Sequence, residues 1–157
     1  SKPINFVLPF ADVTKAEMVA RLIKTPGLGE WATTSRSCVH SSWREPGIGH
    51  CGQCPACIER HQTFVVARVQ DQTHYSRHIW ASADPLCDDY LRALLDDAMA
   101  WLEQDPRVLR RFRQHCALSE VPPSDRERLA YLCLRQAQEV VSVYGHLLHP
   151  RTMRAAA

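Results

Sequence analysis

Glycine is scarce in this sequence, which leaves little for the loops that commonly cradle phosphate groups. Its 157 residues include six glycines, with no Gly-Gly pair and no Walker-type G-x-x-x-x-G-K-[ST] loop. It also lacks a G-x-S-x-G elbow for a nucleophilic serine and any plausible pair of carboxylates for acid–base catalysis. Because phosphate loops hold nucleotides through backbone amides, we expect this chain not to bind ATP productively by itself.

Long apolar runs are missing as well. None approaches the roughly 20 residues that span a bilayer, and no signal peptide opens the chain. The formal net charge is only +2, which argues for neither a nucleic-acid nor a membrane partner. The seven cysteines, an odd number, are typical of a reducing compartment. We therefore expect a cytoplasmic chain with one modest core.

Four of the cysteines lie within 20 residues, with the spacing C-x12-C-x2-C-x2-C. They are Cys38, Cys51, Cys54 and Cys57. Four thiolates satisfy the tetrahedral coordination of Zn²⁺ and leave no open position. Gly52 allows a tight backbone path between two of them, and Pro55 suits the first turn of a helix that would return Cys57 to the metal. The spacing predicts a closed, structural zinc site.

Other uses of these cysteines remain open. C-x2-C-x2-C is also ferredoxin-like spacing, although the Cys-Pro pair that follows such runs is missing after Cys57. Disulfides would suit a secreted protein better, and C-x2-C pairs are poorly disposed for structural bridges. His40, His50 and His61 are nearby spare ligands in principle, although we interpret them as polar residues around the site. His74 and His78 could share a helical face as a separate metal pair, but we interpret them as ordinary loop residues.

The residues around the cysteines form a longer motif. Ser37-Cys38 is followed by His50-Cys51-Gly52-Gln53-Cys54-Pro55-Ala56-Cys57, then by Arg60 and Phe64. Upstream, Leu8-Pro9 precedes Thr14-Lys15-Ala16-Glu17-Met18-Val19. Together these motifs resemble the C-terminal zinc-binding part of the 7-cyano-7-deazaguanine synthase (QueC) family, over about residues 4–68. Val39 and Thr63 replace the family's usual aromatic residue and glycine, which indicates a divergent member.

The resemblance implies an ATP-dependent ligase. Members of the family convert 7-carboxy-7-deazaguanine, ammonia and ATP into the nitrile through an adenylated intermediate, in queuosine biosynthesis. Relatives also occur in antiphage (antiviral defence) operons. Because the family's phosphate loop is absent from these 157 residues, the resemblance places the ATP site upstream of Ser1 or on another chain. Zinc would then order a loop of the substrate pocket rather than perform chemistry.

The fold class that we expect is mainly α, with a short N-terminal strand, a zinc-stapled loop and a C-terminal helical region. Ile4–Leu8 is the one convincing strand, ended by Pro9. A lone strand leaves its backbone groups unpaired. The resemblance would make it the last strand of an α/β ATP-pyrophosphatase-type domain, and an extended arm is the alternative.

Periodicity and capping signals predict the helices. The first runs from Thr14 to Lys24 with a Thr14–Glu17 capping box, and the second from Pro55 to about Gln70 with Phe64, Val65 and Val69 inward. The third opens at Asp84-Pro85, and Asp105-Pro106 ends it and starts a fourth. A Ser124–Glu127 box would begin the last and longest. Cys87, Cys116 and Cys133 fall on apolar stripes, as small core residues do.

These signals divide the chain into a zinc-binding segment (residues 1–70), a linker (71–83), a helical extension (84–150) and a tail (151–157). One hypothesis is the zinc-bearing part of a QueC-like enzyme, whose partners are a 7-deazapurine and the missing upstream domain. The alternative is a non-catalytic, zinc-stapled module that binds a second copy or another protein. A nucleic-acid partner would depend only on a row of arginines, which we interpret as a solvated helix face: Arg107, Arg110, Arg111 and Arg113.

Overall fold

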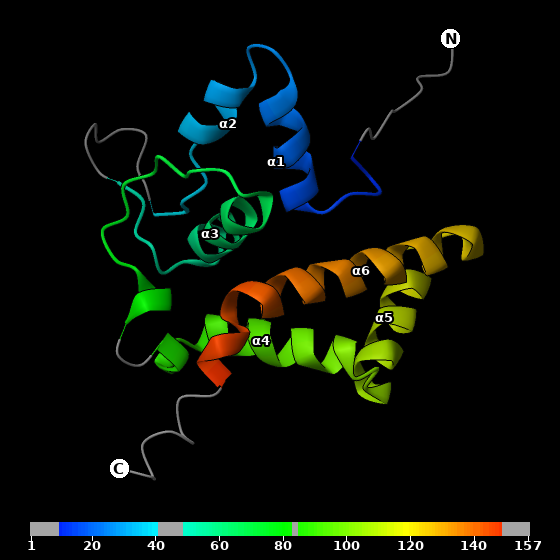
Figure 1. Ribbon diagram of the computed structural model, residues 1–157. Coiled ribbons are helices and arrows are strands. Elements are labelled where there is room, and N and C mark those ends of the chain that lie inside the picture. The colour runs from blue at the N-terminus through cyan, green and yellow to red at the C-terminus, as the bar shows by residue number, and fades with distance from the viewer. Residues whose placement is uncertain (1–9, 41–48, 83–84, 149–157) are drawn as a thin grey trace.

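The computed structural model describes residues 10–40, 49–82 and 85–148. Six α-helices occur in these ranges: α1 (Lys15–Lys24), α2 (Gly29–Thr34), α3 (Pro55–Ala67), α4 (Asp89–Leu102), α5 (Pro106–Leu118) and α6 (Pro123–Tyr144) (Figure 1). Short 3-10 turns cover Ile79–Ala81, Pro85–Cys87 and Gly145–Leu148. The described residues contain no strand, and the expected strand Ile4–Leu8 lies outside them. The mainly helical fold is therefore confirmed.

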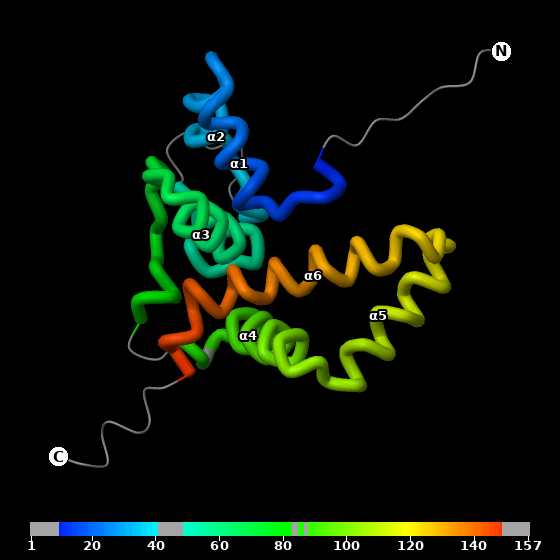
Figure 2. The backbone as a smooth tube through the Cα atoms, turned by 45° about the vertical axis from the view of Figure 1, so that its right-hand side comes forward, coloured from blue at the N-terminus to red at the C-terminus, as the bar shows by residue number. Residues whose placement is uncertain are grey.

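The helices form two groups that meet at α3. α1 and α2 pack together, and α1 also packs on α3. α4 and α6 lie side by side in opposite directions, while α5 joins their far ends, as the two views agree (Figures 1 and 2). α3 touches both α6 and α4. This arrangement places the cysteine segment, which leads into α3, next to the helical extension.

One apolar core joins α3 to the helical pair α4 and α6. It consists of Ile58, Leu91, Leu95, Ala98, Ala137, Val140, Tyr144 and Leu147. The members on α4 recur at i, i+4 and i+7, the spacing of one helical face. Ile58 is the contribution of α3, and it is fully buried. The segment predicted to bind zinc and the predicted extension thus share buried surface, while the boundaries proposed between them remain a prediction.

Several helix ends follow their local signals. Thr14 and Glu17 form the predicted capping box, with hydrogen bonds of 3.2 Å and 3.0 Å. Asp105 caps α5 by accepting a 2.7 Å hydrogen bond from the amide of Arg107. Such side chains satisfy backbone donors that the first turn of a helix leaves unpaired. These boundaries were predictable because capping is a local interaction.

Other helix ends differ from the prediction. α3 ends at Ala67 rather than near Gln70, because Arg68 takes a left-handed conformation with φ of 55°. The turn after Asp84-Pro85 is 3-10, and α4 begins four residues later, where Asp88 accepts from the amide of Leu91 at 2.9 Å.

The start of α6 and one buried position also need correction. The Ser124–Glu127 box is absent, since α6 begins at Pro123 with no side-chain cap. A proline at the first helical position has no amide to satisfy. Val65 is 48% exposed rather than inward, whereas Gln62 and Thr63 of the same helix are buried. The buried side of α3 therefore includes polar residues.

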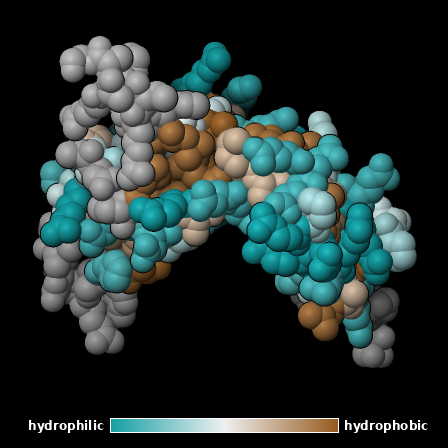
Figure 3. All heavy atoms as spheres, turned by 90° about the horizontal axis from the view of Figure 1, so that it is seen from below, coloured by the Kyte–Doolittle hydropathy of each residue, from teal (hydrophilic) through white to brown (hydrophobic). Residues whose placement is uncertain are grey.

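Large apolar side chains also remain on the surface of the described residues. Trp31 is 62% exposed, Tyr131 61% and Leu118 85%. The space-filling view shows an arched face with apolar side chains gathered toward the middle of the arch (Figure 3). None of the described helices has the length and apolar character needed to cross a membrane.

Candidate metal centre and an adjoining polar pocket

The four cysteines that the spacing singled out come together in space. The sulfur atoms of Cys38, Cys51, Cys54 and Cys57 all lie within 4.8 Å of one another. Two of the sulfur pairs, Cys51 with Cys57 and Cys54 with Cys38, are 3.9 Å apart. All except Cys51 are buried. A loop and the start of α3 thus gather four soft ligands at one point.

The sulfur positions fit a single tetrahedral metal ion. With Zn–S bonds of about 2.3 Å, the edge of a sulfur tetrahedron is about 3.8 Å, close to the two separations of 3.9 Å. Disulfides do not fit this arrangement, because they need sulfurs about 2.05 Å apart, whereas the sulfurs of Cys51 and Cys57 and those of Cys54 and Cys38 are 3.9 Å apart. A four-iron cluster would sit between its thiolates and hold them farther apart. The donor set therefore fits one zinc-sized ion.

The backbone supports this arrangement of sulfur atoms. The amide of Cys51 donates to the sulfur of Cys38, and the amide of Cys54 to the sulfur of Cys51, both at 3.3 Å. Amide donors of this kind stabilise thiolates in metal knuckles, because the sulfur carries negative charge. Cys54 is also the N-cap residue of α3, with Pro55 at the first helical position as predicted. Cys57 consequently turns back to its partners.

A short backbone pairing holds the cysteine loop against residues 74–79. His50 and Tyr75 form a parallel bridge, in which the amide of His50 donates to the carbonyl of His74 at 2.9 Å. The amide of Ser76 donates to the carbonyl of His50 at 2.7 Å. The segment predicted to be a linker is therefore the second wall of the cysteine site.

Two glycines make this close approach possible. A Cβ atom at Gly49 would lie 2.6 Å from the carbonyl oxygen of His74, and one at Gly52 would lie 1.6 Å from that of Arg77. Gly52 also has φ of 73°, which side chains rarely adopt. Together with Gly47 these glycines spell G-x-G-x-x-G, a nucleotide-binding pattern in other contexts. Here Gly49 and Gly52 instead allow the cysteine loop to lie close to the backbone of His74 and Arg77.

The protonation of the cysteines depends on their surroundings. Burial favours a raised pKa at Cys38, but hydrogen bonds from the backbone of Cys51 and His40 outweigh it and lower the pKa to about 6. Burial raises the pKa of Cys57, and hydrogen bonds with Cys54 and Cys38 raise it further. Because metal ligands must be thiolates, a bound cation would release protons from this cluster.

An ion pair outside the cysteine motif organises the neighbouring backbone. The guanidinium of Arg60 donates to both carboxylate oxygens of Asp71, with Nη2 to Oδ1 at 3.1 Å. It also donates to the carbonyls of Thr33 and Ser35, at 2.8 Å and 2.9 Å. Arg60 belongs to the family motif, but no signal in the sequence pointed to Asp71. The pair joins α3 to the end of α2 and to the second wall of the site.

Tyr75 completes this polar network. Its hydroxyl donates to Asp71 Oδ2 at 2.6 Å, and its ring lies in the same buried cluster as Cys38, Cys54 and Cys57. Burial raises the pKa of the hydroxyl, and the neighbouring carboxylate raises it further. Tyr75 therefore stays a neutral donor, and it links the ion pair to the metal site.

A polar pocket of about 270 Å³ opens beside the cysteine loop. It is lined by Thr33, Thr34, Ser35, Arg36, Gly49, His50, Gln72, Thr73 and His74. None of the described residues in this lining carries a carboxylate. His50 is only 5% exposed, and its Nδ1 atom has no hydrogen-bond partner among the described residues. Burial lowers its pKa, and the positive charge of Arg60 lowers it further, so His50 is neutral near pH 7.

The histidines proposed as spare metal ligands do not join the cysteine cluster in the described part of the chain. His61 instead pairs with the hydroxyl of Tyr144 at 3.0 Å and stacks on Trp80, with ring centroids 3.9 Å apart. His78 lies edge-on to Trp80 and Tyr75. These contacts agree with a structural role for His61 and His78.

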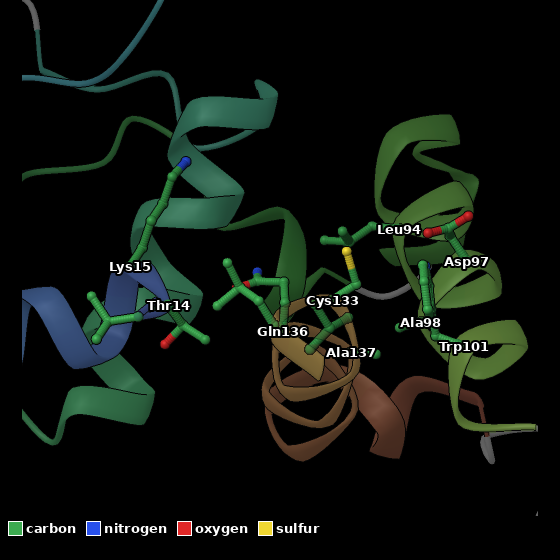
Figure 4. Close-up of a pocket in the computed structure, with 12 residues that line it drawn as sticks. Thr14, Lys15, Leu94, Asp97, Ala98, Trp101, Cys133, Gln136 and Ala137 are labelled. Carbon is green, nitrogen blue, oxygen red and sulfur yellow. The ribbon is translucent and has the colours of Figure 1, made fainter. Parts of the chain in front are cut away.

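A second pocket, of about 370 Å³, lies between the start of α1 and the pair α4 and α6. Figure 4 shows Thr14 and Lys15 on one side of it, Cys133, Gln136 and Ala137 in the middle, and Leu94, Asp97, Ala98 and Trp101 on the other side. Its charged groups are already paired: Lys15 with Glu59, and Asp97 with Arg111. The pocket therefore offers an apolar surface without uncommitted charge.

Comparison with known proteins finds similarity to the same family that the motif resembles. The family model described as "Queuosine biosynthesis protein QueC" matches residues 1–68. The 7-cyano-7-deazaguanine synthase of Rhizobium etli (strain CIAT 652) is 35% identical over 83 residues, which cover 51% of this chain and 31% of that protein. The enzyme of the same name from Methanocaldococcus jannaschii is 39% identical over 75 residues, covering 46% of this chain and 31% of that protein.

The match thus spans about a third of the length of these relatives. No solved structure gives a significant match to the chain. The family match contains all four cysteines, Gly52 and Arg60, the residues from which the site is built. Over residues 1–68, this chain is therefore similar to the QueC family.

Proposed function

We propose that the four cysteines hold a structural zinc ion in the zinc-bearing part of a QueC-like, ATP-dependent enzyme. Its substrate would be 7-carboxy-7-deazaguanine or a related 7-deazapurine carboxylate. The observation that carries this proposal is the gathering of four cysteine sulfurs within 4.8 Å, inside the segment that matches the family. Residues 85–148, which lie beyond the family match, would be an addition to this part.

Zinc, when bound by Cys38, Cys51, Cys54 and Cys57, supplies a closed cross-link and no open position for substrate. The protein's own residues then set the shape of the site. Arg60 and Asp71 fix the end of α2 against residues 71–75, and Gly52 lets the cysteine loop lie against Arg77. The metal therefore contributes folding free energy, on the order of 10 kcal/mol for structural sites, rather than a catalytic step.

The reaction that we propose begins with attack of the substrate carboxylate on the α-phosphate of ATP, which releases pyrophosphate and forms an acyl adenylate. Ammonia then displaces AMP to give the amide. A second ATP adenylates the amide oxygen with release of pyrophosphate, and loss of AMP and protons from the nitrogen gives the nitrile. The ATP-binding region would lie outside these 157 residues, upstream or on another polypeptide, because no Walker-type loop is present. This chain would contribute the metal-ordered wall of the substrate pocket.

Turnover assays test the proposal directly. Purified chain is incubated with ATP, ammonia and 7-carboxy-7-deazaguanine, alone and together with the ATP-binding region encoded with it. AMP release and the deazapurine product are followed by mass spectrometry. We expect turnover only when both parts are present, and a strong loss with Cys54→Ser. A matched Cys133→Ser variant, altered outside the cluster, should retain activity.

Two results would contradict the proposal. Consumption of ATP by the chain alone would mean that the ATP site is misplaced. Iron with a visible charge-transfer band, in place of about one zinc per chain, would overturn the assignment of the metal.

A second candidate is a non-catalytic, zinc-stapled module that binds a second copy or another protein. The exposure of the large apolar side chains of Trp31, Leu118 and Tyr131 favours it, because a protein partner could cover such side chains. We propose that the isolated chain self-associates through such surface. Light scattering that shows a monomer at micromolar concentration would speak against this, and a self-associating chain without turnover under any condition would favour the module.

A further inference from the structure

Charged side chains fasten the start of α1 to α6. The guanidinium of Arg135 donates to the carboxylate of Glu17 and to the backbone carbonyl of Asp12. The guanidinium of Arg128 forms an ion pair with the carboxylate of Asp12. These partners are 116 to 123 positions apart in the chain, and two views show the start of α1 beside α6 (Figures 1 and 2). The contacts therefore hold the segment that leads into α1 as well as its first turn.

A hydrogen-bond network continues this contact inward. The hydroxyl of Thr14, the N-cap residue of α1, donates to Oε1 of Glu139 on α6. The side-chain amide of Gln62 on α3 donates to Oε2 of the same carboxylate at 3.5 Å. Thr14 is 3% exposed and Gln62 is 1% exposed. Polar atoms at such depth need a partner, and Glu139 supplies one to α1 and to α3. We call Arg128, Arg135 and Glu139 the α6 brace.

The α6 brace spans the boundary of the family match. Its three residues lie outside residues 1–68, whereas its partners Asp12, Thr14 and Glu17 lie inside them. α1 packs on α3, and the first turn of α3 contains Cys57. The brace thus fastens the point at which the polypeptide enters the metal-binding segment.

The stability of α1 does not account for these contacts. Val19 of α1 is already buried, and Lys15 pairs with Glu59 of α3, so the helix is attached to the segment by other means. The outer ion pair of the brace has side chains that are 42% and 61% exposed, and ion pairs at such exposure add little to the stability of the fold. Their effect is on geometry, because contacts at residues 12, 14 and 17 fix the direction of the chain.

We propose that the α6 brace sets the direction from which the polypeptide enters the metal-binding segment, with Arg135 and Glu139 as its positioning residues. The consequence for activity rests on the proposed function: an ATP-binding region joined before α1 would meet the metal-ordered wall in the orientation that the brace imposes. A displacement of about 1 Å between parts of a shared site costs about a hundredfold in rate. The helices beyond the family match would thereby act on the reaction without touching the substrate.

Hydrogen exchange measures the brace without any assay of activity. The zinc-loaded, full-length chain is compared with Arg135→Gln, and exchange of the backbone amides is followed by mass spectrometry. Exchange of residues 12–18 should become about tenfold faster in the variant, as expected for loss of a hydrogen bond between charged groups, while exchange of α4 stays unchanged. Arg113→Gln removes an exposed arginine of α5 and should leave both regions unchanged. Unchanged exchange of residues 12–18 in Arg135→Gln would overturn the brace.

Two variants of Glu139 separate its hydrogen bonds from the packing of its side chain. Glu139→Gln keeps an oxygen that accepts from Thr14, so exchange of residues 12–18 should stay within about threefold of the wild type. Glu139→Leu has a similar volume without an acceptor, and exchange should rise about tenfold. Equal exchange in the two variants would overturn the assignment of Glu139. Zinc content is measured for every variant to confirm an intact cysteine cluster.

The turnover assay with the ATP-binding region tests the positioning role. Arg135→Gln should raise KM for 7-carboxy-7-deazaguanine about tenfold and leave KM for ATP unchanged, because the metal-ordered wall is displaced and the ATP site is not. Loss of folded protein alone would lower kcat and leave both KM values unchanged. Arg135→Lys keeps the positive charge, and it should raise KM for the deazapurine less than Arg135→Gln does.

The two experiments fail independently of each other. Faster exchange in Arg135→Gln together with unchanged KM values would overturn the positioning role. A wild-type chain that shows no turnover with the ATP-binding region would contradict the proposed function alone, and the exchange rates would still decide whether α6 braces α1.

Discussion

The hydroxyl of Tyr144 donates a 2.8 Å hydrogen bond to the carbonyl oxygen of Ile58, 86 residues away in the chain. Because its hydrogen is used there, the same hydroxyl accepts from Nδ1 of His61, 3.0 Å away. One phenol thus joins the last turn of α6 to two turns of α3. Tyr144 is fully buried, so no water replaces these bonds.

Tyr144→Phe should therefore destabilise the whole chain. The change leaves the His61 donor without its acceptor, and an unsatisfied buried group costs about 1–3 kcal/mol. Urea denaturation followed by circular dichroism measures the free energy of unfolding. Tyr131→Phe is the matched control, since Tyr131 is 61% exposed, and it should change stability by less than about 0.5 kcal/mol. Equal effects of the two variants would contradict the structural role of Tyr144.

Replacing one cysteine of the cluster should remove the metal and loosen the loop around it. For Cys54→Ser we expect loss of zinc by elemental analysis and faster proteolysis of residues 35–57, because metal binding is local folding energy. The helices after residue 84 should persist, since α4 and α6 pair mainly with each other. Complete loss of the helical circular dichroism signal would show instead that the extension has no core of its own.

Two glycines with similar backbone angles offer a sharper comparison. Gly27 has φ of 79°, and a Cβ atom added there would have no atom within 4 Å, whereas Gly52 has φ of 73° and its added Cβ would lie 1.6 Å from the carbonyl oxygen of Arg77. Gly27→Ala should cost about 1 kcal/mol, the ordinary penalty of a left-handed conformation. Gly52→Ala should additionally force the cysteine loop away from residues 76–79 and reduce zinc content. Equal zinc content in both variants would contradict this packing.

The lowered pKa of His61 predicts how the stability of the protein depends on pH. Burial lowers its pKa from the ordinary 6.5 to about 4, so between these values the unfolded chain binds more protons than the folded one. The contribution of His61 is therefore present above pH 6.5 and is lost as pH falls toward 4. Between pH 7 and pH 5 the loss should be up to about 2 kcal/mol.

The control for this prediction is His61→Gln, which lacks the titrating group. Protonation of the thiolates also releases zinc at low pH, so the comparison is made between the two proteins at each pH rather than along one curve. Urea midpoints at pH 5 and pH 7 should differ less in the variant than in the wild type. The same pH dependence in both would assign the effect to other groups.

Features that depend on neighbours in sequence were predictable. The Thr14 cap and the start of α5 at Asp105-Pro106 arise from residues a few positions apart. The gathering of the four cysteines follows from a recognisable ligand spacing within 20 residues. The family motif singled out Arg60 in the sequence. Nothing singled out its partner Asp71, because an acidic residue in a polar stretch does not belong to any periodic pattern.

The predictions that proved wrong concern features that depend on tertiary contacts. Val65 was expected inward because it is apolar, yet α3 buries Gln62, whose amide donates to Glu139 of α6 at 3.5 Å. A polar residue becomes acceptable inside when a distant helix offers an acceptor, and no local pattern reveals that helix. The polar pocket was missed likewise, because α2 and residues 72–74 meet only in the fold.

Cys57 and Ile58 are consecutive residues, both fully buried, yet they belong to different clusters: one to the cysteine site, the other to the core of α4 and α6. A fragment that stopped before α4 would leave Ile58 facing water. The helices α4 and α6 and the metal-binding segment therefore form one structural unit. A relative without these helices needs a smaller or polar side chain at the position after its last cysteine. Otherwise another segment must bury the apolar side chain at that position.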